Sequence, residues 1–115
     1  MLELPIGLFA NTSQLQFLYL DHNMVSTVLG YFAGLSQLRV LDVGHNQLSA
    51  VTPCLFSDLY KLSELYLNDN NITRVSNGGF SGLSAVWIIA MSGNNIAEVE
   101  NGAYRDAEPD RVAAR

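Results

Sequence analysis

Hydrophobic and polar positions recur along this chain with a period of about 24 residues. Each copy follows the pattern L-x-x-L-x-L-x-x-N-x-L, in which valine, isoleucine or methionine can replace leucine. The asparagine returns at spacings of 23, 24 and 24 residues, at Asn23, Asn46, Asn70 and Asn94. A fixed period of this length indicates stacked units that contact only their neighbours. Arrays of this kind usually present surfaces for binding.

Each copy contains a short segment in which inward apolar residues flank one outward residue, and this alternation is the period of a β-strand. The four segments are Leu18–Leu20, Leu41–Val43, Leu65–Leu67 and Ile89–Met91. Because long return segments separate them, the strands are expected to pair in parallel. The pattern therefore predicts a parallel four-stranded sheet with its apolar residues facing a core.

The asparagine follows each strand, where the chain turns inward and leaves buried backbone groups without partners. An amide side chain both donates and accepts hydrogen bonds, so it can satisfy N–H and C=O groups together. One such residue per unit predicts a structural ladder through the stack, made by Asn23, Asn46, Asn70 and Asn94.

The second half of each unit carries an aromatic column, formed by Phe9, Phe32, Phe56, Phe80 and Tyr104. Together with the leucine and asparagine columns, it resembles the leucine-rich repeat family, and in particular the typical 24-residue subclass of secreted and cell-surface proteins. The resemblance covers roughly residues 4–104. It implies an α/β-type repeat, a right-handed leucine-rich repeat solenoid with a parallel concave β-sheet and a mostly irregular convex side.

The repeat divides the chain into an array over residues 1–106 and a degenerate tail over residues 107–115. The array contains a partial unit, 1–14, and the units 15–37, 38–61, 62–85 and 86–106. In the tail, Pro109 follows acidic residues in the manner of a first helical turn, which favours a short helix. Because the chain begins partway through a unit, we expect it to be a segment of a larger receptor or adhesion-type protein.

The composition argues against nucleic acid and membrane as partners of this segment. The net charge is −5, and the six Lys and Arg residues are too scattered to form the basic stripe that nucleic acid requires. The longest apolar run, residues 85–91, is far shorter than the roughly 20 residues that span a bilayer. We therefore expect no nucleic acid partner, no membrane insertion within this segment and no cofactor.

Catalysis is not expected either. No serine or cysteine is placed beside a histidine by the repeat register, and there is no glycine-rich phosphate loop. His22, His45 and Asp69 share one row and are metal-binding residue types, but polar residues of any kind are ordinary before the ladder asparagine. We predict solvated turn residues there, with no metal site and no enzyme activity.

Three further residues have a predicted chemistry. Asn11 and Asn71 begin N-x-S/T sequons, which indicate glycosylation or chance in equal measure. Cys54 replaces the glycine that the other units have at Gly7, Gly30, Gly78 and Gly102. With no second cysteine, it is expected to be a small, partly buried residue.

The solvent side of the strands is the predicted binding surface, since the repeat leaves these positions free. The candidate partner-binding residues are Phe17, Tyr19, Asp21, Asp42, Glu64, Tyr66 and Trp87. Aromatic residues anchor interfaces, and the carboxylates favour a protein ligand that is basic or amide-rich. An alternative stays open, in which Tyr19 and Tyr66 simply pack across the sheet as β-forming residues.

These observations predict a protein-binding recognition segment of an extracellular or membrane-anchored leucine-rich repeat protein, such as the ectodomain of a signalling receptor or an adhesion glycoprotein. The expected location is therefore extracellular or at the cell surface. The alternative is an intracellular leucine-rich repeat scaffold or regulator, which the missing cysteine clusters and missing signal sequence favour.

Overall fold

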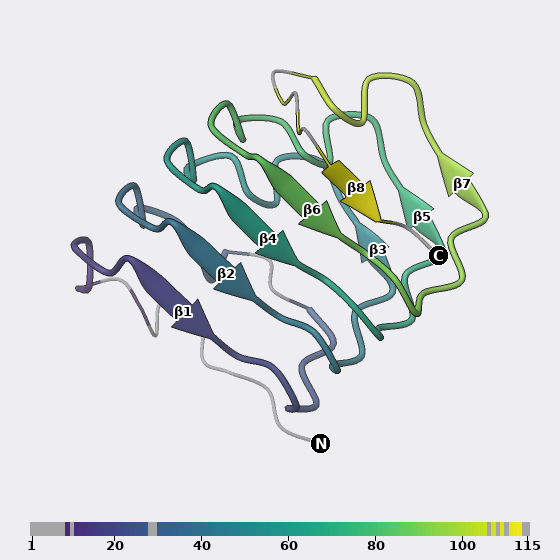
Figure 1. Cartoon of the computed structure of the whole chain (residues 1–115), viewed down its shortest axis with the longest axis horizontal. Coiled ribbons are helices and arrows are strands. Elements are labelled where there is room, and N and C mark those ends of the chain that lie inside the picture. Colours follow the sequence, from purple (N-terminus) through teal and green to yellow (C-terminus); the bar gives the residue numbers. More distant parts are fainter. Residues whose placement is uncertain are drawn as a thin grey trace.

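A computed structural model describes residues 9, 11–27, 30–105, 107, 109 and 111–113. Five short strands form one parallel sheet in the order β1-β2-β4-β6-β8 (Figure 1). Their bounds are β1 Phe17–Tyr19, β2 Val40–Asp42, β4 Glu64–Tyr66, β6 Ile88–Ala90 and β8 Arg111–Ala113. Each strand belongs to one turn of the chain, so the structure confirms the predicted leucine-rich repeat solenoid with its parallel sheet.

The register of the sheet follows the repeat. Leu18 pairs with Leu41, Leu41 with Leu65 and Leu65 with Ile89, and three of these four residues are fully buried. The strands begin one residue earlier than predicted. Cross-unit hydrogen bonds nevertheless continue past their ends, for example from the Leu67 N–H to the Ala90 carbonyl at 2.7 Å.

The tail corrects two predictions. Residues 111–113 form a fifth strand, β8, that pairs with β6, so the predicted short helix is wrong and the sheet is wider than four strands. Val112 pairs with Ile89, 23 residues earlier, and the same step separates Leu41 from Leu18. The edge of β6 offers backbone partners, while a helix of so few residues is marginal in water.

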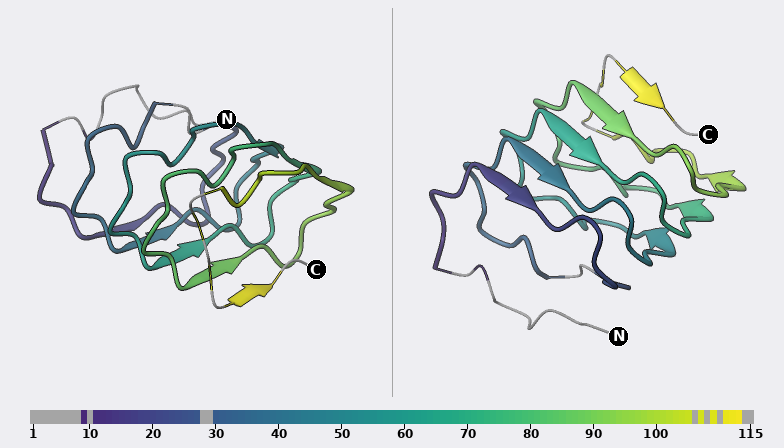
Figure 2. Two further views of the ribbon diagram at one scale, coloured as in Figure 1. Left: turned by 90° about the horizontal axis from the view of Figure 1, so that it is seen from above. Right: turned by 60° about the horizontal axis from the view of Figure 1, so that its bottom comes forward.

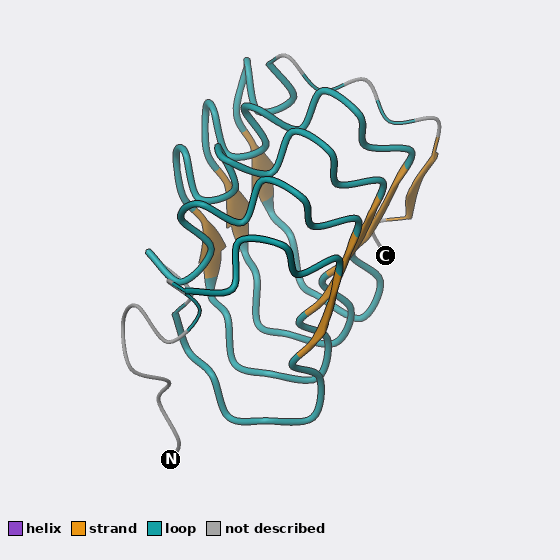
Figure 3. Cartoon of the chain, turned by 90° about the vertical axis from the view of Figure 1, so that its left-hand side faces the viewer, coloured by secondary structure: helices purple, strands orange, loops and turns teal. Residues whose placement is uncertain are grey.

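The return segments are more regular than expected. Three two-residue strands form a second parallel sheet in the order β3-β5-β7, with bounds Ala50–Val51, Arg74–Val75 and Glu98–Val99. Figure 3 shows the two sheets on opposite edges of the stacked turns, with irregular chain between them. The predicted convex side is therefore mostly loop, but it also contains this short second sheet, which the apolar pattern alone did not predict.

A continuous core lies between the two sheets (Figure 2). Inward leucines fill the side near the larger sheet, and the predicted aromatic column fills the wider side. Phe32 and Phe56 have ring centroids 6.1 Å apart, Phe56 and Phe80 are 6.3 Å apart, and Phe80 and Tyr104 are 5.1 Å apart. Phe56 and Phe80 are essentially fully buried, and each of these rings packs against the rings of the units before and after it.

The asparagine ladder makes bonds both within a unit and between units. Asn46 donates from Nδ2 to the Val43 carbonyl of its own unit and to the Leu20 carbonyl of the preceding unit, at 3.1 and 3.0 Å. Its Oδ1 accepts the N–H of buried Val25 at 3.0 Å. Asn70 and Asn94 repeat this arrangement one and two units later.

Asn23 differs from the other ladder residues. Its Nδ2 donates to the carbonyls of Leu20 and Asp21 in its own unit, at 2.9 and 3.3 Å, and its side chain is exposed. No bond to a preceding unit is found for it among the described residues. Asn23 therefore closes its own turn, whereas the other three asparagines also hold two units together.

Cys54 is exposed, which corrects the prediction of a partly buried residue. Its φ angle is +62°, and the glycines at the same repeat position have φ of +79° at Gly30, +77° at Gly78 and +81° at Gly102. The repeat requires a left-handed residue at this turn, which is the reason that the other units use glycine. The pattern thus reflected backbone conformation and not the packing of a small side chain.

Candidate functional site

The outward side of the larger sheet, called here the concave face, holds the predicted binding residues. Tyr19, Asp42 and Tyr66 lie directly opposite one another on β1, β2 and β4. Phe17 and Glu64 occupy the neighbouring row, on either side of Val40. The register therefore brings together residues that are 47 positions apart in the sequence, from Tyr19 to Tyr66.

Exposure divides the predicted residues into two groups. Phe17, Tyr19 and Trp87 are 53%, 61% and 51% exposed, which is unusual for large apolar or aromatic side chains. The remaining residues are partly buried, and these are Asp21, Asp42, Glu64 and Tyr66. Asp21 lies just beyond the end of β1, and Trp87 lies just before β6, so these two lie at opposite ends of their strands and mark the limits of the predicted surface.

Tyr66 has a polar partner on its own strand. Its hydroxyl donates to Glu64 Oε1 at 2.6 Å. This hydrogen bond to a carboxylate, together with partial burial, raises the pKa of Tyr66 to about 12. The interaction holds the Tyr66 ring in place on the face and neutralises no charge, because Tyr66 stays protonated at ordinary pH.

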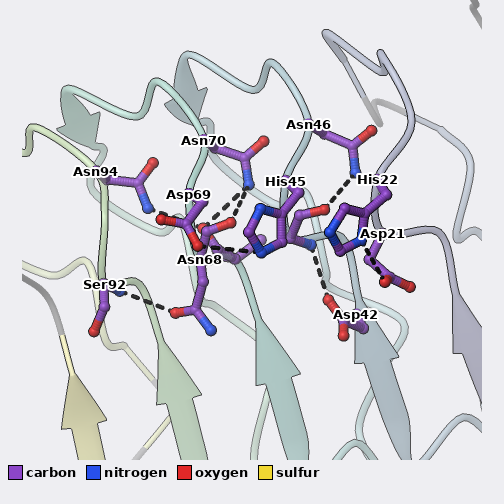
Figure 4. Close-up of polar contacts among 12 residues, drawn as sticks. Asp21, His22, Asp42, His45, Asn46, Asn68, Asp69, Asn70, Ser92 and Asn94 are labelled. Carbon is purple, nitrogen blue, oxygen red and sulfur yellow. Dashed lines mark hydrogen bonds and ion pairs between the residues drawn. The ribbon is translucent and has the colours of Figure 1, made fainter.

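A polar row lies where the strands end, in the turns that lead to the asparagine ladder (Figure 4). The rings of His22 and His45 are stacked, with centroids 4.1 Å apart and an angle of 13° between their planes. His22 Nδ1 lies 2.9 Å from Asp21 Oδ2, and His45 Nε2 lies 3.2 Å from Asp69 Oδ2. The hydrogen bond with His22 lowers the pKa of Asp21. Each histidine thus has its own carboxylate partner.

The geometry of this row does not converge on one point. Nitrogen lone pairs lie in the plane of an imidazole, so two nearly parallel rings direct them into separate planes, whereas a zinc site needs ligands aimed at a common centre. Among the described residues, no group of three or more His, Cys, Asp or Glu side chains is arranged to hold a metal ion.

Backbone conformation explains why this row tolerates few residue types. His22, His45 and Asp69 have φ of +60°, +53° and +57°, and the fourth unit has Gly93 at +79°. At Gly93 a Cβ atom would lie 1.9 Å from Asp69 Oδ1. The row is therefore shaped by a left-handed turn in every unit, which the sequence pattern did not indicate.

Polar side chains beside the strands also support the turns. Asp42 Oδ1 accepts the Gly44 N–H at 2.9 Å, and Asn68 Oδ1 accepts the Ser92 N–H of the following unit at 3.0 Å. Sequence reasoning placed Asp42 on the binding surface but missed this second role. The sequence did contain a signal for this turn-supporting role. One row consists of short polar residues and glycine, which favour turns, and its members are Asp21, Gly44, Asn68 and Ser92.

Both predicted sequons are accessible. Asn11 and Asn71 are exposed, and Asn71 uses its backbone N–H, not its side chain, in a 2.8 Å bond to the Leu48 carbonyl. Neither residue belongs to a strand of the larger sheet.

Comparison with known proteins agrees with this geometry. A family model described as leucine rich repeat matches residues 1–48 and 36–96. The chain belongs to the leucine-rich repeat family. No curated protein matches the sequence significantly.

A solved structure shares the leucine-rich repeat fold. It is the crystal structure of a TLR13–ssRNA13 complex, with a TM-score of 0.52 and 18% sequence identity. The match covers 92% of this chain and 22% of that chain, so the present array spans about a fifth of the length of its structural relative. None of the described residues belongs to a helix long and apolar enough to cross a bilayer.

The Tyr66–Glu64 contact predicts a distinctive alkaline titration. Tyr66 should ionise near pH 12, about two pH units above ordinary tyrosine. Because the folded pKa is raised, the contact stabilises the fold below pH 10, and this contribution is lost as the pH rises from about 10 to 12. Burial also raises the pKa of Tyr104, so two tyrosines ionise late. Tyrosinate absorbance should lose the Tyr66 part of this late fraction in Tyr66→Phe, while Glu64→Ala should move that part towards pH 10.

Tyr19→Phe is the matched control for this titration, since Tyr19 is also on the face but no hydrogen bond of its hydroxyl is found among the described residues. It should leave the late-ionising fraction intact. Equal titration curves for Tyr66→Phe and Tyr19→Phe would contradict the Tyr66–Glu64 contact.

Proposed function

We propose that this chain is a protein-binding recognition segment, without catalytic activity, and that its partner docks on the concave face. The observation that carries the proposal is the exposure of two large aromatic side chains, Phe17 and Tyr19, on the outward side of a regular sheet. Residues that hold the array together point inward, and their exposure is near zero. The outward aromatic side chains contact solvent, and a partner that covers them would bury this apolar surface.

Charge on the same face supports a basic or amide-rich protein ligand. Four residues of this face and its turns supply carboxylates, and these are Asp21, Asp42, Glu64 and Asp69. Arg39, the residue before β2, is an exposed cation. Such a face attracts a basic partner at long range, and the attraction weakens with salt because exposed charges are screened within about 10 Å at 0.1 M ionic strength.

A protein partner is favoured over a nucleic acid. The solved structure contains single-stranded RNA, but at 18% identity its resemblance to this chain extends to the fold alone. Nucleic acid binding depends on Lys and Arg residues that neutralise phosphates. This chain has only six such residues against eleven carboxylates, and its concave face is acidic.

The setting we propose is the extracellular part of a receptor or adhesion protein that is anchored at the cell surface. The 24-residue period with its phenylalanine column supports this setting, because it resembles the subclass common in secreted and cell-surface proteins. The exposed sequons at Asn11 and Asn71 are compatible with glycosylation there.

An intracellular scaffold is the second candidate, and one observation favours it. Cys54 is a free, exposed thiol, and such thiols are more common in proteins of reducing compartments. The extracellular candidate passes through the secretory pathway and the intracellular candidate does not. Both would use the same docking face.

Glycosylation separates the two settings. When the parent protein is expressed at its natural level in its own cells, enzymatic removal of N-glycans should increase its gel mobility. The combined Asn11→Gln and Asn71→Gln variant should lose whatever part of this shift the present segment contributes. A parent that carries no N-glycan and fractionates with the cytosol would favour the intracellular scaffold.

The docking face can be tested by an alanine scan against the protein that the full-length parent captures. Tyr19→Ala and Tyr66→Ala should each weaken binding by about 2 kcal/mol, which is typical of aromatic anchors. Phe17→Ala and Trp87→Ala should have smaller effects, because these residues flank the central row. The measurement is the dissociation constant from titration calorimetry at two salt concentrations.

Exposed residues outside both sheets serve as the control set for the scan. Ser57, Asp58 and Lys61 are exposed and lie outside both sheets, so their alanine variants should bind normally. Neutral effects at Tyr19 and Tyr66, combined with losses at these three residues, would show that the concave face is not the docking surface.

A further inference from the structure

The central row of the concave face has an unusual composition. On three adjacent strands, the tyrosines Tyr19 and Tyr66 flank the single carboxylate of Asp42. On the other side of Tyr66, the same row continues with Ala90, which is only 7% exposed. A short acidic side chain between two long aromatic ones should leave a depression between the two rings.

The spacing of the strands sets the width of this depression. Neighbouring strands lie about 4.8 Å apart, so the backbones that carry Tyr19 and Tyr66 are separated by roughly 10 Å. A cation held midway is about 5 Å from each ring, within the roughly 6 Å reach of a cation–π interaction. Among the described residues, neither tyrosine ring contacts another aromatic ring, so the space is not filled by stacking.

The carboxylate of Asp42 retains capacity for a ligand. Its Oδ1 accepts the Gly44 N–H at 2.9 Å, and this bond fixes the direction of the group. Within the described part of the chain, no ion pair involves Asp42 and no hydrogen bond reaches its Oδ2. One of the two rings is held as well, since the Tyr66 hydroxyl donates to Glu64, whose charge adds to the negative potential.

We propose that Tyr19, Asp42 and Tyr66 form a slot that accepts one arginine side chain of the protein partner. The slot rests on the proposed function, because it lies on the concave face that we assign to docking. Arginine fits better than lysine. Its guanidinium is planar, stacks on aromatic faces and presents a fork of donors to a carboxylate, whereas an ammonium is a compact, strongly hydrated charge.

The slot can be probed without knowing the partner. The probe is the capped tripeptide acetyl-Gly-Arg-Gly-amide, titrated into the full chain and followed by NMR. Two matched peptides replace arginine by citrulline, which keeps the planar shape without the charge, and by lysine, which keeps the charge without the plane. We expect the arginine peptide to bind on the order of tenfold more tightly than the citrulline peptide, with shifts centred on the three slot residues.

Ring currents provide a signature that a simple surface ion pair lacks. Protons of the arginine side chain that lie between two ring faces should move upfield on binding. Asp42→Asn and Tyr19→Ala should each weaken binding several-fold and reduce this upfield shift. Asp58→Asn is the matched control, because it removes one exposed carboxylate charge from the opposite side and should change neither quantity.

Each outcome decides the proposal. Binding without an upfield shift, equal affinity for arginine and lysine, or equal losses in Asp42→Asn and Asp58→Asn would overturn the slot. If the slot fails while the alanine scan still places the partner on Tyr19 and Tyr66, the docking face stands without an arginine site. If the peptide binds at these residues but the scan places the partner elsewhere, the concave face is not the docking surface, and the slot binds arginine without serving the partner.

Discussion

The interaction on which the structure depends is the hydrogen bonding that the ladder asparagines make across units. A single Asn46 side chain reaches the Leu20 carbonyl and the Val25 N–H of the preceding unit while closing its own turn on Val43. These groups lie where the chain leaves the larger sheet and enters the core, away from water. Leaving them unpaired would cost the full desolvation penalty of each group. The ladder therefore fixes the distance and register between neighbouring units.

Fixed register has a direct consequence for the concave face. Because Leu41 must pair with Leu65, Asp42 must pair with Tyr66, and no rearrangement of the outward residues is available without moving the core. The outward side chains are thus positioned by the rigid core and the asparagine ladder, although they contribute little to either. A binding surface of this kind pays little ordering cost when a partner arrives. This separation of roles explains why the inward columns repeat and the outward rows do not.

The predictability of the structure follows the same division. The inward leucines, the asparagines and the phenylalanine column repeat at a fixed period, so the sequence alone was sufficient for the fold and for the row of Tyr19, Asp42 and Tyr66. Features that depend on backbone angles were not visible. Cys54 stands at a position with a left-handed φ and is exposed. His22 and His45 stack because they occupy equivalent left-handed turns of neighbouring units. The helix expected near Pro109 was wrong because residues 111–113 pair with β6 and continue the sheet.

The ladder is tested most directly by comparing Asn46→Ala with Asn23→Ala in the full chain. Asn46 joins two units and is buried, whereas Asn23 is exposed and its bonds to described residues lie within its own turn. Urea unfolding should show a loss of about 1–3 kcal/mol for Asn46→Ala, and faster hydrogen exchange at the Val25 amide. Asn23→Ala should cost no more than about 0.5 kcal/mol and leave that amide protected. Equal, small losses in both variants, with the Val25 amide still protected, would contradict the account.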